Sequence, residues 1–119
     1  MPEKAKIFFA EDDDLVRKLV RRVCLASGHT IELEATTLED ALEKIKLAKE
    51  MGVNVAVLDG NLTKGERLKD DGEIIAQALE KEIPDIIIVS HSAILRKWGK
   101  KNLTKPEDTM KLGSTIKAL

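Results

Sequence analysis

The sequence is poor in several residue types, and each shortage excludes a class of protein. A single cysteine, Cys24, excludes an internal disulfide framework and a zinc site built from cysteines. The aromatic residues are only Phe8, Phe9 and Trp98, too few for a platform that stacks single-stranded bases. With 20 basic and 21 acidic residues, the net charge of -1 argues against binding nucleic acid or anionic membrane by bulk electrostatics.

Long apolar runs are also missing. No run approaches the roughly 18 residues that a membrane span needs. Near the N-terminus, four apolar residues at 7–10 are followed directly by four acids, which is unlike a signal peptide. We therefore expect a cytoplasmic protein that binds no membrane. Its 119 residues, 43% of them hydrophobic, predict one domain over 1–119 with no output domain.

What the sequence does contain is an alternation of short apolar runs and amphipathic stretches. Strands are predicted at residues 7–10, 30–35, 53–58, 86–89 and 103–104. Helices are predicted at 15–27, 38–48, 74–83 and 107–118. Strands that alternate with helices form βαβ units, so we expect an α/β fold with a doubly wound parallel sheet of five strands.

Polar side chains follow four of the predicted strands. Glu11 and Asp12 follow the first strand, Asp59 the third, Ser90 the fourth and Lys105 the fifth. In a doubly wound sheet the carboxyl ends of the strands open onto a crevice in which ligands bind. We therefore expect these side chains to share one site.

The chemistry of this set points to magnesium and phosphate. Three neighbouring carboxylates raise one another's pKa, and a hard divalent cation relieves their repulsion. Mg²⁺ suits a site made of oxygen ligands, whereas the two histidines, His29 and His91, lack the spacing of a zinc or copper site. A carboxylate beside a metal ion and an ammonium group can accept a phosphoryl group and form an acyl phosphate.

In the order and types of these residues the chain resembles the receiver domain of two-component response regulators, in its single-domain, CheY-like form. The resemblance covers essentially the whole chain. It implies a flavodoxin-like (βα)5 fold and a cytoplasmic phosphoprotein of a phosphorelay. Such a protein assists its own phosphoryl transfer and dephosphorylation and is otherwise not an enzyme. The partners implied are a histidine kinase or phosphotransfer protein and an unidentified output protein, with no nucleic acid and with a homodimer left open.

The resemblance also implies roles for individual residues. Asp59 would be the phosphoacceptor. Mg²⁺ would be held by Glu11, Asp12, Asp59 and the backbone carbonyl of Asn61.

The same resemblance implies a phosphate-binding pair and a particular peptide bond. Ser90 would be the switch hydroxyl and Lys105 the partner of the phosphate. The peptide bond between Lys105 and Pro106 would be cis, a state that proline tolerates.

Four features depart from the family pattern. Asn102 stands where the family usually has an aromatic residue, three positions before Lys105. The segment between Ser90 and Lys105 lacks about 7 residues, or two helical turns, so the helix between the fourth and fifth strands should be short or missing. The loop over residues 60–72 is longer than usual by about one helical turn.

The fourth departure is His91, which replaces a small residue and is a candidate modulator. It could narrow access to the site or respond to pH near neutrality, and a packing role is also open.

The shortened segment carries a cluster of basic residues around the one tryptophan. Its members are Arg96, Lys97, Trp98, Lys100 and Lys101. Two interpretations of this cluster are open. It is either a solvated patch or a partner surface with Trp98 as the anchor.

Two other functions remain open beside the phosphorylated receiver. One is a protein-interaction module that keeps the receiver fold and works without phosphorylation, which Asn102 and the missing helix favour. The other, more remote, is a small Mg²⁺-dependent aspartyl phosphohydrolase. Its usual pair of aspartates would lie on the first strand, whereas the acceptor predicted here, Asp59, follows the third.

Overall fold

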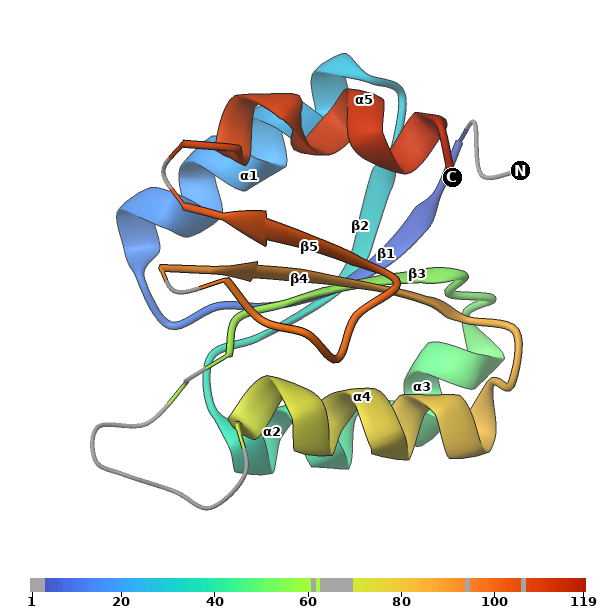
Figure 1. The fold of residues 1–119 in the computed structure, drawn as a ribbon. Helices are drawn as coiled ribbons and strands as arrows, with labels where there is room; N and C mark the ends of the chain where they lie inside the picture. The colour runs from blue at the N-terminus through green and yellow to red at the C-terminus, as the bar shows by residue number, and fades with distance from the viewer. Residues whose placement is uncertain (1–3, 61, 63–69, 94, 106) are drawn as a thin grey trace.

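The chain folds around one parallel sheet of five strands. The computed structural model describes residues 4–60, 62, 70–93, 95–105 and 107–119. The strand order is β2-β1-β3-β4-β5, with every neighbouring pair parallel. Helices cover both faces of the sheet, as Figure 1 shows. The doubly wound, CheY-like α/β fold predicted from the sequence is therefore confirmed.

All five predicted strands are present, although only β2 has the predicted ends and β4 differs most. They are β1 (Lys6–Ala10), β2 (Thr30–Ala35), β3 (Val55–Leu58), β4 (Ile87–Ser92) and β5 (Lys101–Thr104). β4 does not end before Ser90 as predicted, because Ser90 and Ser92 pair in register with Asn102 and Thr104 of β5. Asn102 consequently lies within a strand, directly opposite Ser90.

The helices start close to the predicted positions but are more broken. They are α1 (Asp14–Ala26), α2 (Leu38–Glu43), α3 (Ile45–Glu50), α4 (Asp71–Glu82), the 3-10 turn η1 (Thr109–Lys111) and α5 (Leu112–Lys117). The single helix predicted after Thr37 is interrupted at Lys44, whose ammonium bonds to the Glu34 carbonyl at 2.7 Å and to Asp40 at 3.1 Å. None of the helices formed by the described residues is long and apolar enough to cross a membrane.

The helix that would join β4 to β5 is missing from the described residues of that connection, 93 and 95–100. This confirms the prediction made from the short segment. The half-buried indole of Trp98 packs there against the hydrophobic core on the α4 side of the sheet. A single aromatic side chain thus covers apolar surface that a helix would otherwise cover.

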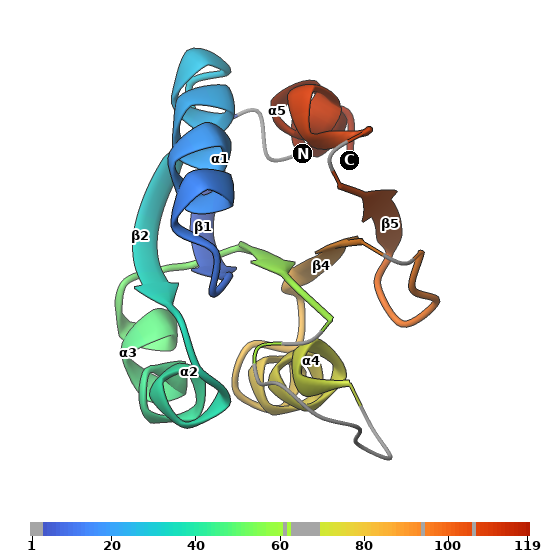
Figure 2. The ribbon, with the colours of Figure 1, turned by 90° about the vertical axis from the view of Figure 1, so that its left-hand side faces the viewer.

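Two separate cores lie on the two faces of the sheet, and Figure 2 shows the helices that cover each. One core joins Phe9, Val57 and Val89 to α1 and α5, and the other joins Phe8, Ala56 and Ile88 to α2, α3 and α4. Successive residues of a strand point to opposite faces, so wholly apolar strands serve both cores.

The α1–α5 contact is close enough to require a glycine. A Cβ on Gly113 would lie 2.8 Å from both the Val23 carbonyl oxygen and the Ser27 Cβ, and closer still to the Ser27 hydroxyl. Backbone atoms of α1 cannot move aside as the end of a flexible side chain can. The separation of the two helices is therefore fixed by the absence of a side chain at residue 113.

We predict that Gly113→Ala lowers the free energy of unfolding by about 1–3 kcal/mol, because the new methyl group overpacks the α1–α5 contact. Urea unfolding followed by circular dichroism measures the change. Lys117→Ala, an exposed change on the same helix, is the control and should stay within about 0.5 kcal/mol of wild type. A Gly113→Ala variant as stable as that control would contradict the packing argument.

Candidate functional site

Three carboxylates meet at the carboxyl edge of the sheet, as the sequence predicted. Glu11 and Asp12 follow β1, and Asp59 follows the adjacent β3. One carboxylate oxygen from each residue lies within 4.8 Å of the others. Glu11 and Asp59 are buried, at 0% and 5% exposure, while Asp12 is exposed to solvent. Two carboxylates of the cluster are therefore shielded from solvent, and the third lies at the surface.

The Lys105 ammonium joins the two buried carboxylates. Its Nζ donates to Glu11 Oε1 at 2.8 Å and Oε2 at 3.0 Å, and to Asp59 Oδ2 at 3.2 Å. The Lys105 side chain is 16% exposed, so these contacts are largely shielded from water. The structure thus brings together Glu11, Asp12, Asp59 and Lys105 from the ends of three strands.

The Glu11 carboxyl is harder to ionise in this site than in water. Burial and then the negative charge of Asp59 raise the pKa of Glu11 to about 8, although Lys105 and the Asp13 N–H act in the opposite direction. Burial works to lower the pKa of Lys105, but its contacts with Glu11 and Asp59 outweigh burial and raise that pKa. The Lys105 ammonium group therefore does not outweigh the effects of burial and of Asp59 on the ionisation of Glu11.

This donor set fits a hard divalent cation. All three side chains offer carboxylate oxygens, and a divalent cation would favour the ionised form of Glu11 that burial and Asp59 disfavour. Mg²⁺ prefers such oxygen ligands and retains several waters, which the exposed side at Asp12 allows. The site contains no nitrogen or sulfur ligand among the described residues that form the cluster.

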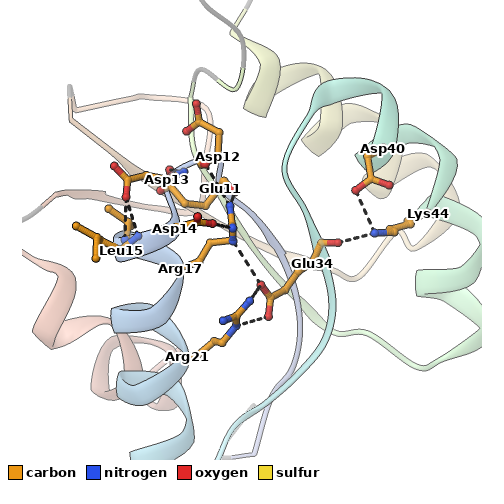
Figure 3. Close-up of polar contacts among 11 residues, drawn as sticks. Glu11, Asp12, Asp13, Asp14, Leu15, Arg17, Arg21, Glu34, Asp40 and Lys44 are labelled. Atoms are coloured by element: carbon orange, nitrogen blue, oxygen red, sulfur yellow. Dashed lines mark hydrogen bonds and ion pairs between the residues drawn. The ribbon is translucent and has the colours of Figure 1, made fainter.

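Arg17 of α1 organises the acidic turn, a role that sequence reasoning missed. Its guanidinium donates to the backbone carbonyls of Glu11 at 3.2 Å and Asp12 at 3.1 Å, and it pairs with Asp14. Figure 3 shows Arg17 reaching back beneath the turn, with Glu34 of β2 beside it. Arg17 thus holds the backbone of residues 11 and 12 through their carbonyls and uses neither of their carboxylates. Only its position one helical turn after the acids could have indicated this role.

Ser90, the predicted switch hydroxyl, and Asn102 contact each other directly. The Ser90 hydroxyl donates to Asn102 Oδ1 at 2.6 Å, and Ser90 is fully buried. Asn102 Oδ1 also accepts from the Gly99 N–H at 3.2 Å, and its Nδ2 donates to the Gly99 carbonyl at 3.0 Å. The serine hydroxyl therefore engages β5 in this structure, and Asn102 ties it to the segment before β5.

His91 is buried and does not behave as a sensor of pH near neutrality. Its Nε2 hydrogen bonds with the Thr109 hydroxyl at 2.7 Å, and its exposure is 0%. Burial, and secondarily the charge of Lys105, lowers the pKa of His91 to about 4. The hypothesis of a response near neutrality is therefore wrong, because such a ring stays neutral there. The packing role left open for His91 agrees with this geometry.

The basic cluster around Trp98 does not form one surface. Lys97, Lys100 and Lys101 are exposed, whereas Arg96 and Trp98 turn inward to the same carboxylate. Asp70 accepts from Arg96 Nη1 at 2.9 Å and from Trp98 Nε1 at 2.8 Å. The structure does not favour a partner surface anchored on Trp98. Trp98 and Arg96 instead dock this segment on Asp70, at the start of α4. Sequence reasoning missed Asp70 because 26 residues separate it from Arg96.

Three predicted features lie outside the described residues. They are the Asn61 carbonyl, the peptide bond at Pro106 and most of the long loop over 60–72. Of that loop, Leu62 is buried and its N–H donates to Asp71 at 2.9 Å.

Comparison with solved structures finds response-regulator receiver domains. A CheY from Borrelia burgdorferi, solved with CheX, BeF3 and Mg²⁺, matches with a TM-score of 0.78 and 17% identity over 96% of this chain and 87% of that one. A CheY-like receiver from Methanospirillum hungatei matches with a TM-score of 0.75 and 18% identity, over 97% of this chain and 92% of that one. The receiver domain of the hybrid histidine kinase CckA matches with a TM-score of 0.73 and 24% identity, over 95% of this chain and 96% of that one.

These matches show the fold of the chain. It has the receiver fold, so the resemblance predicted from the sequence is confirmed at that level. No family model matches the sequence, and no curated protein does.

We predict that Asp12→Asn weakens Mg²⁺ binding about tenfold or more, because it removes one of three carboxylates from the site. Isothermal titration calorimetry with MgCl₂ measures the affinity. Asp85→Asn is the matched control, since Asp85 is an exposed aspartate in the turn before β4 that does not belong to the cluster. Equal affinities for the two variants would argue against a metal site built on Asp12.

We predict that buried His91 makes the protein less stable in mild acid. The folded state keeps His91 neutral down to about pH 4, whereas the unfolded chain takes up a proton near 6.5. Between these values the unfolded state binds more protons, so stability falls as the pH falls, by up to about 1.4 kcal/mol per pH unit.

Urea unfolding of wild type and His91→Gln at several pH values between 7 and 4 tests this. The stability of wild type relative to the variant should decrease toward low pH. Parallel profiles for the two proteins would show that His91 is not the group responsible.

Proposed function

We propose that this chain is a response-regulator receiver that accepts a phosphoryl group on Asp59 and signals by binding another protein. One observation carries the proposal: the Lys105 ammonium bridges Asp59 and Glu11 beside Asp12, at the carboxyl edge of a receiver-fold sheet. The receiver domains that share this fold support it. A set of acids without the lysine would suggest a metal site alone, and the lysine adds a cation for phosphate.

The proposed chemistry is a displacement at phosphorus. A carboxylate oxygen of Asp59 attacks the phosphorus atom and forms the new P–O bond of an acyl phosphate. The bond from phosphorus to the leaving group breaks, and the leaving group keeps the electron pair. Acetyl phosphate would release acetate, and a phosphohistidine of a kinase or phosphotransfer protein would release the imidazole nitrogen.

The residues around Asp59 suit this reaction. Lys105 already contacts an Asp59 oxygen at 3.2 Å and would pair with oxygens of the incoming phosphoryl group. Glu11, Asp12 and Asp59 would hold Mg²⁺, which neutralises charge on the phosphoryl oxygens when bound. Glu11 is fully buried, and Arg17 fixes the turn behind it, so the site keeps its shape as its charge changes.

The proposed output is a protein contact made by this domain's own surface. The three exposed lysines of the β4–β5 connection, Lys97, Lys100 and Lys101, stand beside the segment that Asn102 ties to Ser90. A change at the acceptor site could therefore alter the surface on which those lysines lie.

A second candidate is a receiver-fold interaction module that works without phosphorylation. The hydrogen bond from Ser90 to Asn102 favours it, because a hydroxyl engaged at 2.6 Å is not available to a phosphate until that bond breaks. Amide NMR spectra with and without beryllofluoride and Mg²⁺ separate the two candidates. Shifts around Asp59 and Ser90 support the phosphoacceptor, and unchanged spectra support the module.

We predict that acetyl phosphate with Mg²⁺ adds the mass of one phosphoryl group to the wild-type chain, and that Asp59→Asn abolishes the addition. Intact-protein mass spectrometry measures it, with and without EDTA. Asp85→Asn is the matched control, because Asp85 is an exposed aspartate in the turn before β4, outside the acidic cluster. Labelling that persists in Asp59→Asn, or no labelling of wild type, would refute the assignment of Asp59.

A further inference from the structure

The segment between β4 and β5 places an arginine against the residue that follows Asp59. A Cβ added to Gly60 would lie 2.6 Å from Arg96 Cζ and 2.8 Å from Nη2, and closer still to Nε. Real Cβ atoms do not approach so closely, so the guanidinium occupies the space that a side chain at residue 60 would fill. A second cation thus lies against the backbone next to the acceptor, in addition to Lys105.

Two contacts hold Arg96 in this position. Its Nη1 pairs with Asp70 Oδ1 at 2.9 Å, and its Nε donates to the hydroxyl of buried Ser92 at 3.2 Å. Among the described residues, none accepts a hydrogen bond from Nη2, the nitrogen that lies against Gly60. A guanidinium carries five N–H donors in a planar fork, a geometry that suits phosphate oxygens. Arg96 therefore keeps donors on the side that faces Gly60.

The Asp70 pair is one that a stronger anion can replace. The Arg96 and Asp70 side chains are 18% and 30% exposed, and ion pairs that water reaches contribute little to stability. A phosphoryl group carries more charge than a carboxylate and presents three acceptor oxygens. Asp70 would still have a partner if Arg96 left, because it also accepts from Trp98 Nε1.

The engaged hydroxyl of Ser90 creates a need for such a donor. Ser90 donates to Asn102, so in this structure Lys105 is the one side chain of the predicted phosphate-binding pair that reaches Asp59. Arg96 lies against Gly60, the residue after the acceptor, and comes from the same short segment that Asn102 contacts through Gly99. An arginine there can contribute the phosphate contact that the serine does not make.

We propose that Arg96 is a second cationic ligand of the phosphoryl group on Asp59, and that it exchanges Asp70 for that group on phosphorylation. The inference rests on the proposed role of Asp59 as the acceptor. It makes Arg96 a phosphate-binding residue of the site and makes the Asp70 pair its resting contact. Trp98 shares Asp70 and packs on Gly72, 2.7 Å from where a Cβ would be, so its surroundings change with the exchange.

The test measures the affinity for beryllofluoride, a phosphoryl mimic, in the presence of Mg²⁺ by calorimetry on the full chain. Arg96→Gln should bind about tenfold more weakly than wild type, because it loses a charged hydrogen bond to the mimic. Asp70→Asn should bind more tightly, by a few-fold, because it no longer competes for Arg96. Lys97→Gln, which removes an exposed charge next in sequence, should bind like wild type.

The opposite directions of these changes separate binding from scaffolding. If Arg96 only fastens the segment to α4, Arg96→Gln and Asp70→Asn break the same ion pair and should weaken binding alike, which would overturn the proposal. The double variant excludes a simple charge effect: without Arg96, the gain from Asp70→Asn should disappear. A gain that survives in the double variant would also overturn it. Arg96→Lys, which keeps the charge but not the fork, should lie between Arg96→Gln and wild type.

A fluorescence measurement follows the exchange itself. Trp98 is the only tryptophan and the chain has no tyrosine, so intrinsic emission reports on this one residue. Beryllofluoride should shift the emission of wild type and leave that of Arg96→Gln nearly unchanged at saturation, and equal shifts would contradict the exchange. If wild type binds the mimic through Asp59 but Arg96→Gln binds equally well, only this inference fails. If wild type does not bind at all, the proposed function fails with it.

Discussion

The site depends on one ammonium group that is shared by two buried carboxylates. Glu11 and Asp59 lie side by side with almost no exposure, and Lys105 donates to both. Burying two negative charges without a cation would destabilise the fold by several kcal/mol, and the Lys105 ammonium offsets part of this penalty. Burial and the charge of Asp59 still raise the pKa of Glu11 to about 8. A cation bound beside these carboxylates would favour their ionised forms, so the site is built to respond to a change in charge.

The order of the strands explains why a lysine makes this contact. Glu11 and Asp59 follow β1 and β3, which are neighbours, while Lys105 follows β5, on the far side of β4. Neighbouring strands are about 4.8 Å apart, so the lysine must span about 10 Å from its strand to that of Asp59. A long side chain at the sheet's edge can do this only if its backbone is fixed, and the Lys105 N–H bonds to the Ser92 carbonyl at 2.9 Å. The extension of β4 to Ser92, which the sequence pattern did not predict, is therefore part of the site.

What could be predicted from the sequence was what local patterns determine. Apolar runs that end in acids predicted β1 and β3 and the residues that follow them, because both burial and side-chain direction follow from a strand's own sequence. The length of the 90–105 segment predicted the missing helix. The partners of Arg96, Trp98 and His91 could not be predicted. Each meets a residue far along the chain, Asp70 or Thr109, and only the packed fold decides whether a basic or aromatic side chain faces water. The inward turn of Trp98 is the clearest case, since Lys97 and Lys100 on either side of it are exposed and basic.

The missing helix changes how the β4–β5 side of the domain is stabilised. A helix would cover the sheet with an apolar stripe, whose burial is favourable but difficult to undo. Here one half-buried indole and a set of polar contacts hold the segment: Arg96 to Asp70 and Ser92, Trp98 to Asp70, Asn102 to Gly99, and the Lys100 N–H to the Ile88 carbonyl. Such polar contacts are individually weak and exchange readily for other partners. Because Arg96 lies against Gly60 and Asn102 accepts from Ser90, a change of charge at Asp59 would act on a segment held largely by such contacts. A connection without a helix is in this sense better suited than a packed helix to respond to the site.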